Sequence, residues 1–157
     1  MSARFLITAL CLTLAPVLAA ADLTLVRVTS GWRDAASFKR ISEYFTGKEN
    51  TGKETVLRTH PDRRDGYYFL LRIRNPDGPR HVTARLQIIT DASAKPRDFT
   101  FAPDLRTGDT VLHLGLTGPD WPDAKADPVA WKLELTGANG QILAVEKSYL
   151  WEKPAGQ

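Results

Sequence analysis

The sequence predicts an all-β protein: an immunoglobulin-like, two-sheet antiparallel sandwich of about seven strands, with one short amphipathic helix near residues 35–46. Two observations favour this fold. From Leu23 onward, short runs alternate apolar and polar residues, which is the pattern of strands with one buried face. Turn residues separate these runs about every 8–12 residues, which is the spacing typical of a sandwich.

The N-terminal residues 1–21 are predicted to be a cleaved signal peptide. Arg4 precedes an apolar run over residues 5–14, which is too short to cross a bilayer. Small residues then allow cleavage after Ala19 or Ala21. We therefore expect residues 22–157 to form a single domain that is secreted or periplasmic. The only cysteine, Cys11, lies within the predicted signal, so this domain would contain no disulfide.

The helix near residues 35–46 is the one stretch with helical apolar spacing. Asp34 is a candidate N-cap, and Gly47 is a candidate glycine beyond the C-terminus. One apolar stripe is formed by Phe38, Ile41 and Phe45. We expect this stripe to be buried against an open end or edge of the sandwich. The alternative is a recognition element built on Tyr44, Arg40 and the loop that follows.

The strands follow in order along the chain. They are predicted at residues 23–28, 54–59, 67–75, 80–90, a shorter one near 98–101, 110–118, 131–135 and 142–151. The inward residues of the central strands are Tyr67, Phe69, Leu71, Ile73, Val82, Ala84, Leu86, Ile88, Leu112, Leu114 and Leu116. A slip of one residue would turn each of these apolar faces outward.

Two tight hairpins are predicted from turn residues. The first joins strands 67–75 and 80–90 through the turn sequence PDGP, with Asn75 opposite Arg80. The second joins strands 131–135 and 142–151 through a loop of residues 138–140.

In this second hairpin, the predicted register places apolar residues opposite one another. Leu135 would pair with Leu143, and Leu133 with Val145. A two-residue turn would instead place Leu133 opposite Glu146. The preferred register also leaves Tyr149 and Trp151 on the core side.

Several segments resemble a family of uncharacterised secreted bacterial β-sandwich proteins. They are GWRDAASFKRISEYFTGKENTG, DGYYFLLRIRN, GLTGPDWP and VAWKLEL with SYLWEKP. The likeness extends over nearly all of the chain after the predicted signal. The family has no assigned activity, so the resemblance implies a fold and a compartment but no site residue and no cofactor.

Charge and hydropathy argue against two classes of function. Residues 22–90 carry 13 Lys and Arg against 8 Asp and Glu, whereas residues 91–157 carry 7 against 10. The net charge of residues 22–157 is therefore only +2, which does not favour nucleic acid as a partner. After the predicted signal, no apolar segment approaches the roughly 20 residues of a membrane span.

Catalytic patterns are equally weak. The three histidines, His60, His81 and His113, lie on different predicted elements, so they do not indicate a metal site. No G-x-S-x-G motif is present. Glu134 and Glu146 would face each other only in the rejected hairpin register. The sequence therefore predicts a protein that is not an enzyme and has no cofactor or metal.

Two candidate ligand-binding features remain. The first is a strip of Arg72, Arg74, His81 and Arg85, which the predicted first hairpin would place on one face, suited to an anionic group. The second is Trp121, on a Pro-rich loop. The alternative reading of the strip is an ordinary solvated sheet face.

We expect a non-catalytic binding or structural domain, with an unknown envelope protein or glycan as partner. One alternative is a carbohydrate or anionic-glycan binding module, and a second is an enzyme of unrecognised class.

Overall fold

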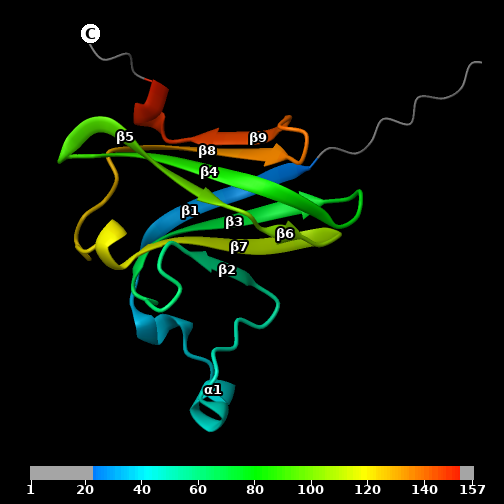
Figure 1. The fold of residues 1–157 in the computed structure, drawn as a ribbon, viewed down its shortest axis with the longest axis vertical. Helices are drawn as coiled ribbons and strands as arrows, with labels where there is room; N and C mark the ends of the chain where they lie inside the picture. The colour runs from blue at the N-terminus through cyan, green and yellow to red at the C-terminus, as the bar shows by residue number, and fades with distance from the viewer. Residues whose placement is uncertain (1–22, 153–157) are drawn as a thin grey trace, which may run out of the picture.

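The computed structural model describes residues 23–152, so the predicted signal peptide lies outside the described residues. Two sheets pack face to face (Figure 1), with strand orders β1-β3-β7-β2 and β5-β4-β8-β9, and a short β6 that pairs with β4. The strands are β1 (Thr24–Arg33), β2 (Thr55–Arg58), β3 (Gly66–Asn75), β4 (Arg80–Thr90), β5 (Ser93–Phe101), β6 (Asp104–Leu105), β7 (Gly108–Thr117), β8 (Ala130–Gly137) and β9 (Ile142–Lys147). The predicted β-sandwich is confirmed, with nine strands among the described residues.

The strand order follows the immunoglobulin pattern, in which strands A, B, E and D form one sheet and C, F and G the other. Here β1, β3 and β7 stand in the places of A, B and E, and β5-β4-β8-β9 in those of C′-C-F-G. The place of D is taken by β2, which comes from between β1 and β3 in the chain. Because β2 runs parallel to β7, the sandwich is not purely antiparallel.

The core lies between the two sheets and confirms the predicted alternation. All the inward residues predicted for the three central strands are buried: Tyr67, Phe69, Leu71, Ile73, Val82, Ala84, Leu86, Ile88, Leu112, Leu114 and Leu116. Leu133 and Leu135 of β8 complete the opposing layer. Each such side chain contributes about 1.5–3 kcal/mol when fully buried, so this layer holds the sheets together.

The predicted first hairpin is wrong. β3 pairs with β1 and β7, whereas β4 pairs with β5, β6 and β8, so the two strands face each other across the core. The turn between them crosses from one sheet to the other. The Asn75 side chain is fully buried there and donates to the carbonyls of Gly78 (2.6 Å) and Arg106 (2.9 Å). The alternation of apolar and polar residues requires only that the apolar faces of the two strands meet. Two strands in facing sheets meet this requirement as well as two strands paired in one sheet.

The predicted loop of the last hairpin is right, but the register beyond it is wrong. The amide of Gly137 donates to the carbonyl of Gln141, which closes the loop at residues 138–140. Leu143 is then bulged out of the ladder, so Leu133 lies opposite Glu146. β9 ends at Lys147 and a 3₁₀ turn, η3 (Tyr149–Glu152), follows. Tyr149 is exposed there, contrary to the prediction, and Trp151 is half-buried.

The predicted helix is divided in two. Asp34 caps a 3₁₀ turn, η1 (Ala35–Phe38), by accepting from the amide of Ser37 at 2.8 Å. Residues 39–40 are extended, and α1 (Ile41–Thr46) then runs to Gly47, which has a φ of 66°. Both predicted ends are therefore correct, but the break changes the direction of the chain. None of the helices among residues 23–152 is long and apolar enough to cross a membrane.

Candidate binding surface on the arch between β1 and β3

Residues 34–65, which we call the arch, connect β1 to β3. The arch contains η1, α1 and β2, and it extends past the β2 side of the β1-β3-β7-β2 sheet, with α1 farthest out (Figure 1). It returns as β2, which pairs with the outer edge of β7, with Val56 opposite His113. The arch therefore covers part of the outer face of the β1-β3-β7-β2 sheet, and it also projects from the body of the protein.

Tyr68 is the centre of the covered face. It alternates with the inward residues of β3 and so points outward, yet it is only 1% exposed. The ring of Phe38 packs on it at 4.6 Å between centroids. The Tyr68 hydroxyl donates to the carbonyl of Arg64 (2.7 Å) and accepts from Nε of Arg58 (2.8 Å). Burial raises the pKa of this hydroxyl, so Tyr68 acts as a neutral clamp that joins two parts of the arch to β3.

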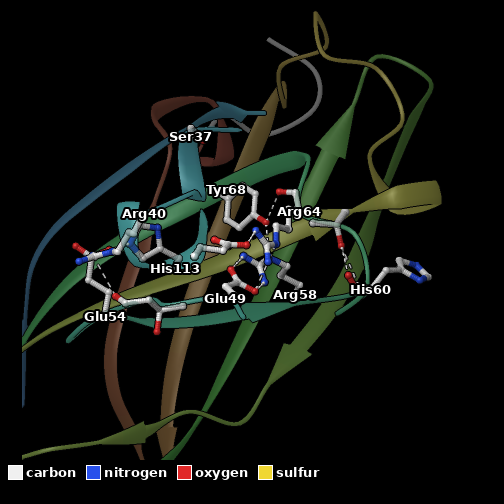
Figure 2. Close-up of polar contacts among 12 residues, drawn as sticks. Ser37, Arg40, Glu49, Glu54, Arg58, His60, Arg64, Tyr68 and His113 are labelled. Atoms are coloured by element: carbon white, nitrogen blue, oxygen red, sulfur yellow. Dashed lines mark hydrogen bonds and ion pairs between the residues drawn. The ribbon is translucent and has the colours of Figure 1, made fainter. Parts of the chain in front are cut away.

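Two arginines join the arch internally, as Figure 2 shows. Arg58 makes a bidentate contact with Glu49, with Nη2 to Oε1 at 2.6 Å and Nη1 to Oε2 at 3.0 Å. Arg64 is bonded to Glu43 of α1 and lies 3.6 Å from Glu49. The hydrogen bond from Arg58 holds the pKa of Glu49 below its usual value, although burial opposes this. Bidentate pairs are strong and directional, so this network fixes α1 and the following loop relative to β2.

His113 is the third covered group. It points outward from β7, between the inward Leu112 and Leu114, but it is only 5% exposed because the arch covers it. Its Nε2 lies 3.0 Å from Oε2 of Glu54, while Nδ1 is buried without a hydrogen-bond partner. Burial lowers the pKa of His113, against the opposing effect of Glu54. Within residues 23–152, no three His, Cys, Asp or Glu side chains gather where they could hold a metal ion.

Two adjoining hollows lie beside this covered face. A groove of about 570 Å³ runs along β1 and β3 and is lined by Thr29, Ser30, Gly31, Trp32, Arg33, Asp34, Ser37, Tyr68 and Leu70. Gly31 leaves it open, since a Cβ there would meet no atom within 4 Å. A smaller hollow of about 100 Å³ shares Arg33 and Ser37 with the groove and reaches His113. The lining is mainly polar, with hydroxyls and one guanidinium at the junction.

The outermost part of the arch, residues 39–53, will be called the tip. Its helix, α1, turns a charged side chain toward the body of the protein and its apolar side toward solvent. Glu43 faces the body and is bonded to Arg64, whereas three large apolar side chains face solvent. They are Ile41 (79% exposed), Tyr44 (76%) and Phe45 (85%). The predicted burial of the apolar stripe is therefore wrong except at Phe38. The break at residues 39–40 turns α1 so that its stripe no longer continues that of η1.

The predicted basic strip does not exist as one surface. Arg72 and Arg74 project from the outer face of β3, whereas His81 and Arg85 project from β4 in the other sheet. Several of these side chains also have acidic neighbours: Arg74 contacts Asp109, His81 contacts Asp104, and Arg85 contacts Asp98. The reason is the same as for the first hairpin, because the strip assumed that β3 and β4 are paired. Binding by any of these residues singly stays a prediction.

Trp121 does not form an exposed platform. It is 4% exposed, packs on the ring of Tyr67 at 4.9 Å between centroids, and donates from Nε1 to the carbonyl of Ala126 at 3.2 Å. A shallow hollow of about 190 Å³ borders it, beside Arg97 and Asp120. Ligand contact at Trp121 therefore stays a prediction that would depend on this edge of the ring.

No local pattern in the sequence predicts that the residues of the arch network meet. Arg58, Arg64 and Glu49 lie in a strand end and two loops, where no local periodicity indicates a network. One signal was available. Tyr68 is a large aromatic side chain at an outward position of a strand. The predicted fold contains no element that would cover it there. Outward aromatic residues in a buried strand indicate that something covers the sheet.

No family model matches this chain, and no curated protein matches it, so the resemblance to a family of secreted proteins stays a prediction. Among solved structures, the chain is similar to an immunoglobulin-like protein from Pseudomonas aeruginosa, at 15% sequence identity and a TM-score of 0.34. The similarity covers 82% of this chain and 96% of that one. A similarity with this TM-score adds no evidence for the fold, which rests on the strand order described above.

Proposed function

We propose that this protein is an exported, non-catalytic β-sandwich domain that binds a partner in the cell envelope through the tip of its arch. One observation carries the proposal: α1 exposes Ile41, Tyr44 and Phe45 together while it buries its carboxylate. Three large apolar side chains clustered in contact with water do not stabilise a soluble protein. Such patches mark sites of association. Export is supported by Arg4 and the apolar run after it.

The arch is also suited to binding because it is held in one shape. Arg58, Arg64 and Tyr68 fix it to the outer face of the sheet through charged and buried hydrogen bonds. A surface that is ordered before it meets its partner loses less conformational entropy on binding. The ion pairs therefore act as a scaffold in this proposal, and the exposed apolar residues act as the contact.

A site-specific photo-crosslinking experiment tests the proposal in cells. The full chain is expressed with a benzophenone amino acid in place of Phe45, which is 85% exposed, and, as a matched control, in place of Tyr149, which is 79% exposed. Tyr149 belongs to η3, which lies on the far side of the molecule from α1 (Figure 1). We expect adducts, with protein or with lipid, from position 45 and few from position 149. Equal labelling from both positions, or none from position 45, would contradict the proposal. Recovery of the processed chain from the periplasm or medium, starting at Ala20 or Asp22, tests export.

A second candidate function is glycan binding in the groove along β1. The observation that favours it is the polar lining, in which Arg33 and the hydroxyls of Thr29 and Ser37 face a space of about 570 Å³. Gly31→Leu would project a bulky apolar side chain into this space, whereas Gly31→Ala would leave most of it open. We expect wild type and Gly31→Ala to be retained by the same members of a glycan array, and Gly31→Leu to lose them. Absence of any retention by the wild type would eliminate this candidate.

A further inference from the structure

We infer that the tip binds the surface of an anionic lipid bilayer, with Ile41, Tyr44 and Phe45 entering the interface between headgroups and acyl chains. This inference rests on the proposed function, because it names the partner of the same surface. It differs from the membrane spans considered above, since a peripheral contact requires only a shallow apolar wedge and nearby cations.

The charge of the tip is the first argument. Residues 39–53 contain four cations, Lys39, Arg40, Lys48 and Lys53, against two carboxylates. Both carboxylates, Glu43 and Glu49, are bonded to arginines outside the tip. The side chains of all four cations are exposed. The tip therefore carries a net positive charge on its exposed side chains, which complements an anionic leaflet.

The placement of these cations supports the same conclusion. Nζ of Lys39 lies 5.8 Å from the centre of the Tyr44 ring, so the ammonium group stands beside the apolar cluster. Tyr44 combines an apolar ring with a polar hydroxyl, as do the aromatic residues that favour the boundary between lipid and water. Amphipathic elements at bilayer surfaces combine aromatic and aliphatic residues with Lys and Arg in this way.

The size of the cluster favours a bilayer over a folded protein. Three side chains of this type, about four-fifths exposed, offer roughly 400 Å² of surface. A stable protein interface buries about 800 Å² on each partner. A second copy of the chain, which would present the same small cluster, meets the same shortfall. A lipid surface adapts to a narrow wedge and has no minimum contact area.

The shape and rigidity of the tip form the last argument. Asn50 donates to the hydroxyl of Ser42 at 2.9 Å, and Arg40 donates to the carbonyl of Thr51 at 3.1 Å, so hydrogen bonds join α1 and the residue before it to the following loop. Figure 1 shows α1 as the outermost element at one end, with η3 at the other. The apolar cluster can therefore reach a flat surface before the sheets do.

Vesicle co-sedimentation of the processed protein tests the inference. Vesicles of phosphatidylcholine alone are compared with vesicles that contain one quarter phosphatidylglycerol. We expect binding to the anionic vesicles only, with a loss of at least ten-fold in the Tyr44→Ser/Phe45→Ser variant. Lys39→Glu/Lys48→Glu should lose at least five-fold for each position, and salt should weaken the wild type in the same way.

The matched control is Tyr149→Ser, which removes an equally exposed tyrosine at the far end and should bind like the wild type. Thermal melts of every variant check that the sandwich is intact. Equal binding to both vesicle types would overturn the electrostatic part of the inference, and unchanged binding by Tyr44→Ser/Phe45→Ser would overturn the insertion. If vesicles are not bound while Phe45 crosslinks a protein in cells, the inference fails and the proposed function stands. If position 45 also yields no adduct, both fail.

Discussion

Replacement of Gly115 by alanine should loosen the arch from the sandwich. Gly115 lies on β7 directly opposite Tyr68 of β3. A Cβ at this position would stand 2.4 Å from Cε1 and 2.7 Å from Cζ of the Tyr68 ring. Carbon atoms in favourable contact lie about 3.5–4.0 Å apart, so the ring would have to move by about 1 Å.

The ring cannot make this movement without losing its partners. The Tyr68 hydroxyl is held between Arg64 and Arg58, at 2.7 and 2.8 Å, and the ring packs against Phe38. Overpacking of a buried site costs about 1–3 kcal/mol, and each weakened hydrogen bond about 1 kcal/mol. We therefore expect Gly115→Ala to lower the free energy of unfolding by about 2–4 kcal/mol.

Urea denaturation followed by circular dichroism measures this change, and Gly31→Ala provides the matched control. Gly31 lies opposite Tyr68 on its other side, in β1, but a Cβ there would meet nothing within 4 Å. Its replacement should change stability by less than about 0.5 kcal/mol. In a Tyr68→Ala background, the cost of Gly115→Ala should largely disappear. An unchanged cost in that background, or none in the wild type, would refute the reasoning.

Three further predictions concern the same region. Arg58→Ala should cost about 1–3 kcal/mol because it removes the part-buried hydrogen bond to Tyr68 and the bidentate pair with Glu49, whereas Arg74→Ala, whose ion pair is exposed, should cost less than about 1 kcal/mol in the same urea assay. Burial lowers the pKa of His113 below 6.5, so the unfolded chain binds a proton there more readily and stability should fall as the pH decreases below about 6.5. Unfolding measured between pH 7.5 and 5.5 should show a shallower fall in His113→Gln, and an equally steep fall would contradict this. Phe45→Ser should leave the melting temperature within about 2 °C, while Phe38→Ala should lower it by several degrees; the reverse order would show that α1 buries its stripe.

Local sequence pattern was sufficient to predict the structure wherever a residue's neighbours in the chain decide which way its side chain or backbone turns. Leu112, Leu114 and Leu116 are buried because side chains alternate across a strand, and that alternation is visible in the sequence. The same holds for Asp34 and Gly47, whose conformations at the ends of the helical segment depend on adjacent backbone groups.

Pairing was not decided by local pattern. The strands that end at Asn75 and begin at Arg80 present apolar faces that suit either a hairpin or two facing sheets. Only the competition among all strands for neighbours places β1 and β7 beside β3. The bulge at Leu143 shows the same limit on a smaller scale, because the loop was correct and a single extra residue changed every later pair.

The candidate site depended most on tertiary structure. The stripe of Ile41 and Phe45 was visible in the sequence, but the extended residues 39–40 turn α1 away from η1. The bond between Glu43 and Arg64, which come from separate parts of the arch, joins the opposite side of α1 to the body of the protein and leaves the apolar side toward solvent.

By itself, then, the sequence determined the class of fold, the inward face of each central strand and the ends of the helical segment, since these follow from period, turn residues and caps. Tertiary structure alone decided which strands are neighbours, what covers Tyr68 and His113, and which way α1 faces. These depend on contacts between residues far apart in the chain, whose relative free energies no local pattern records.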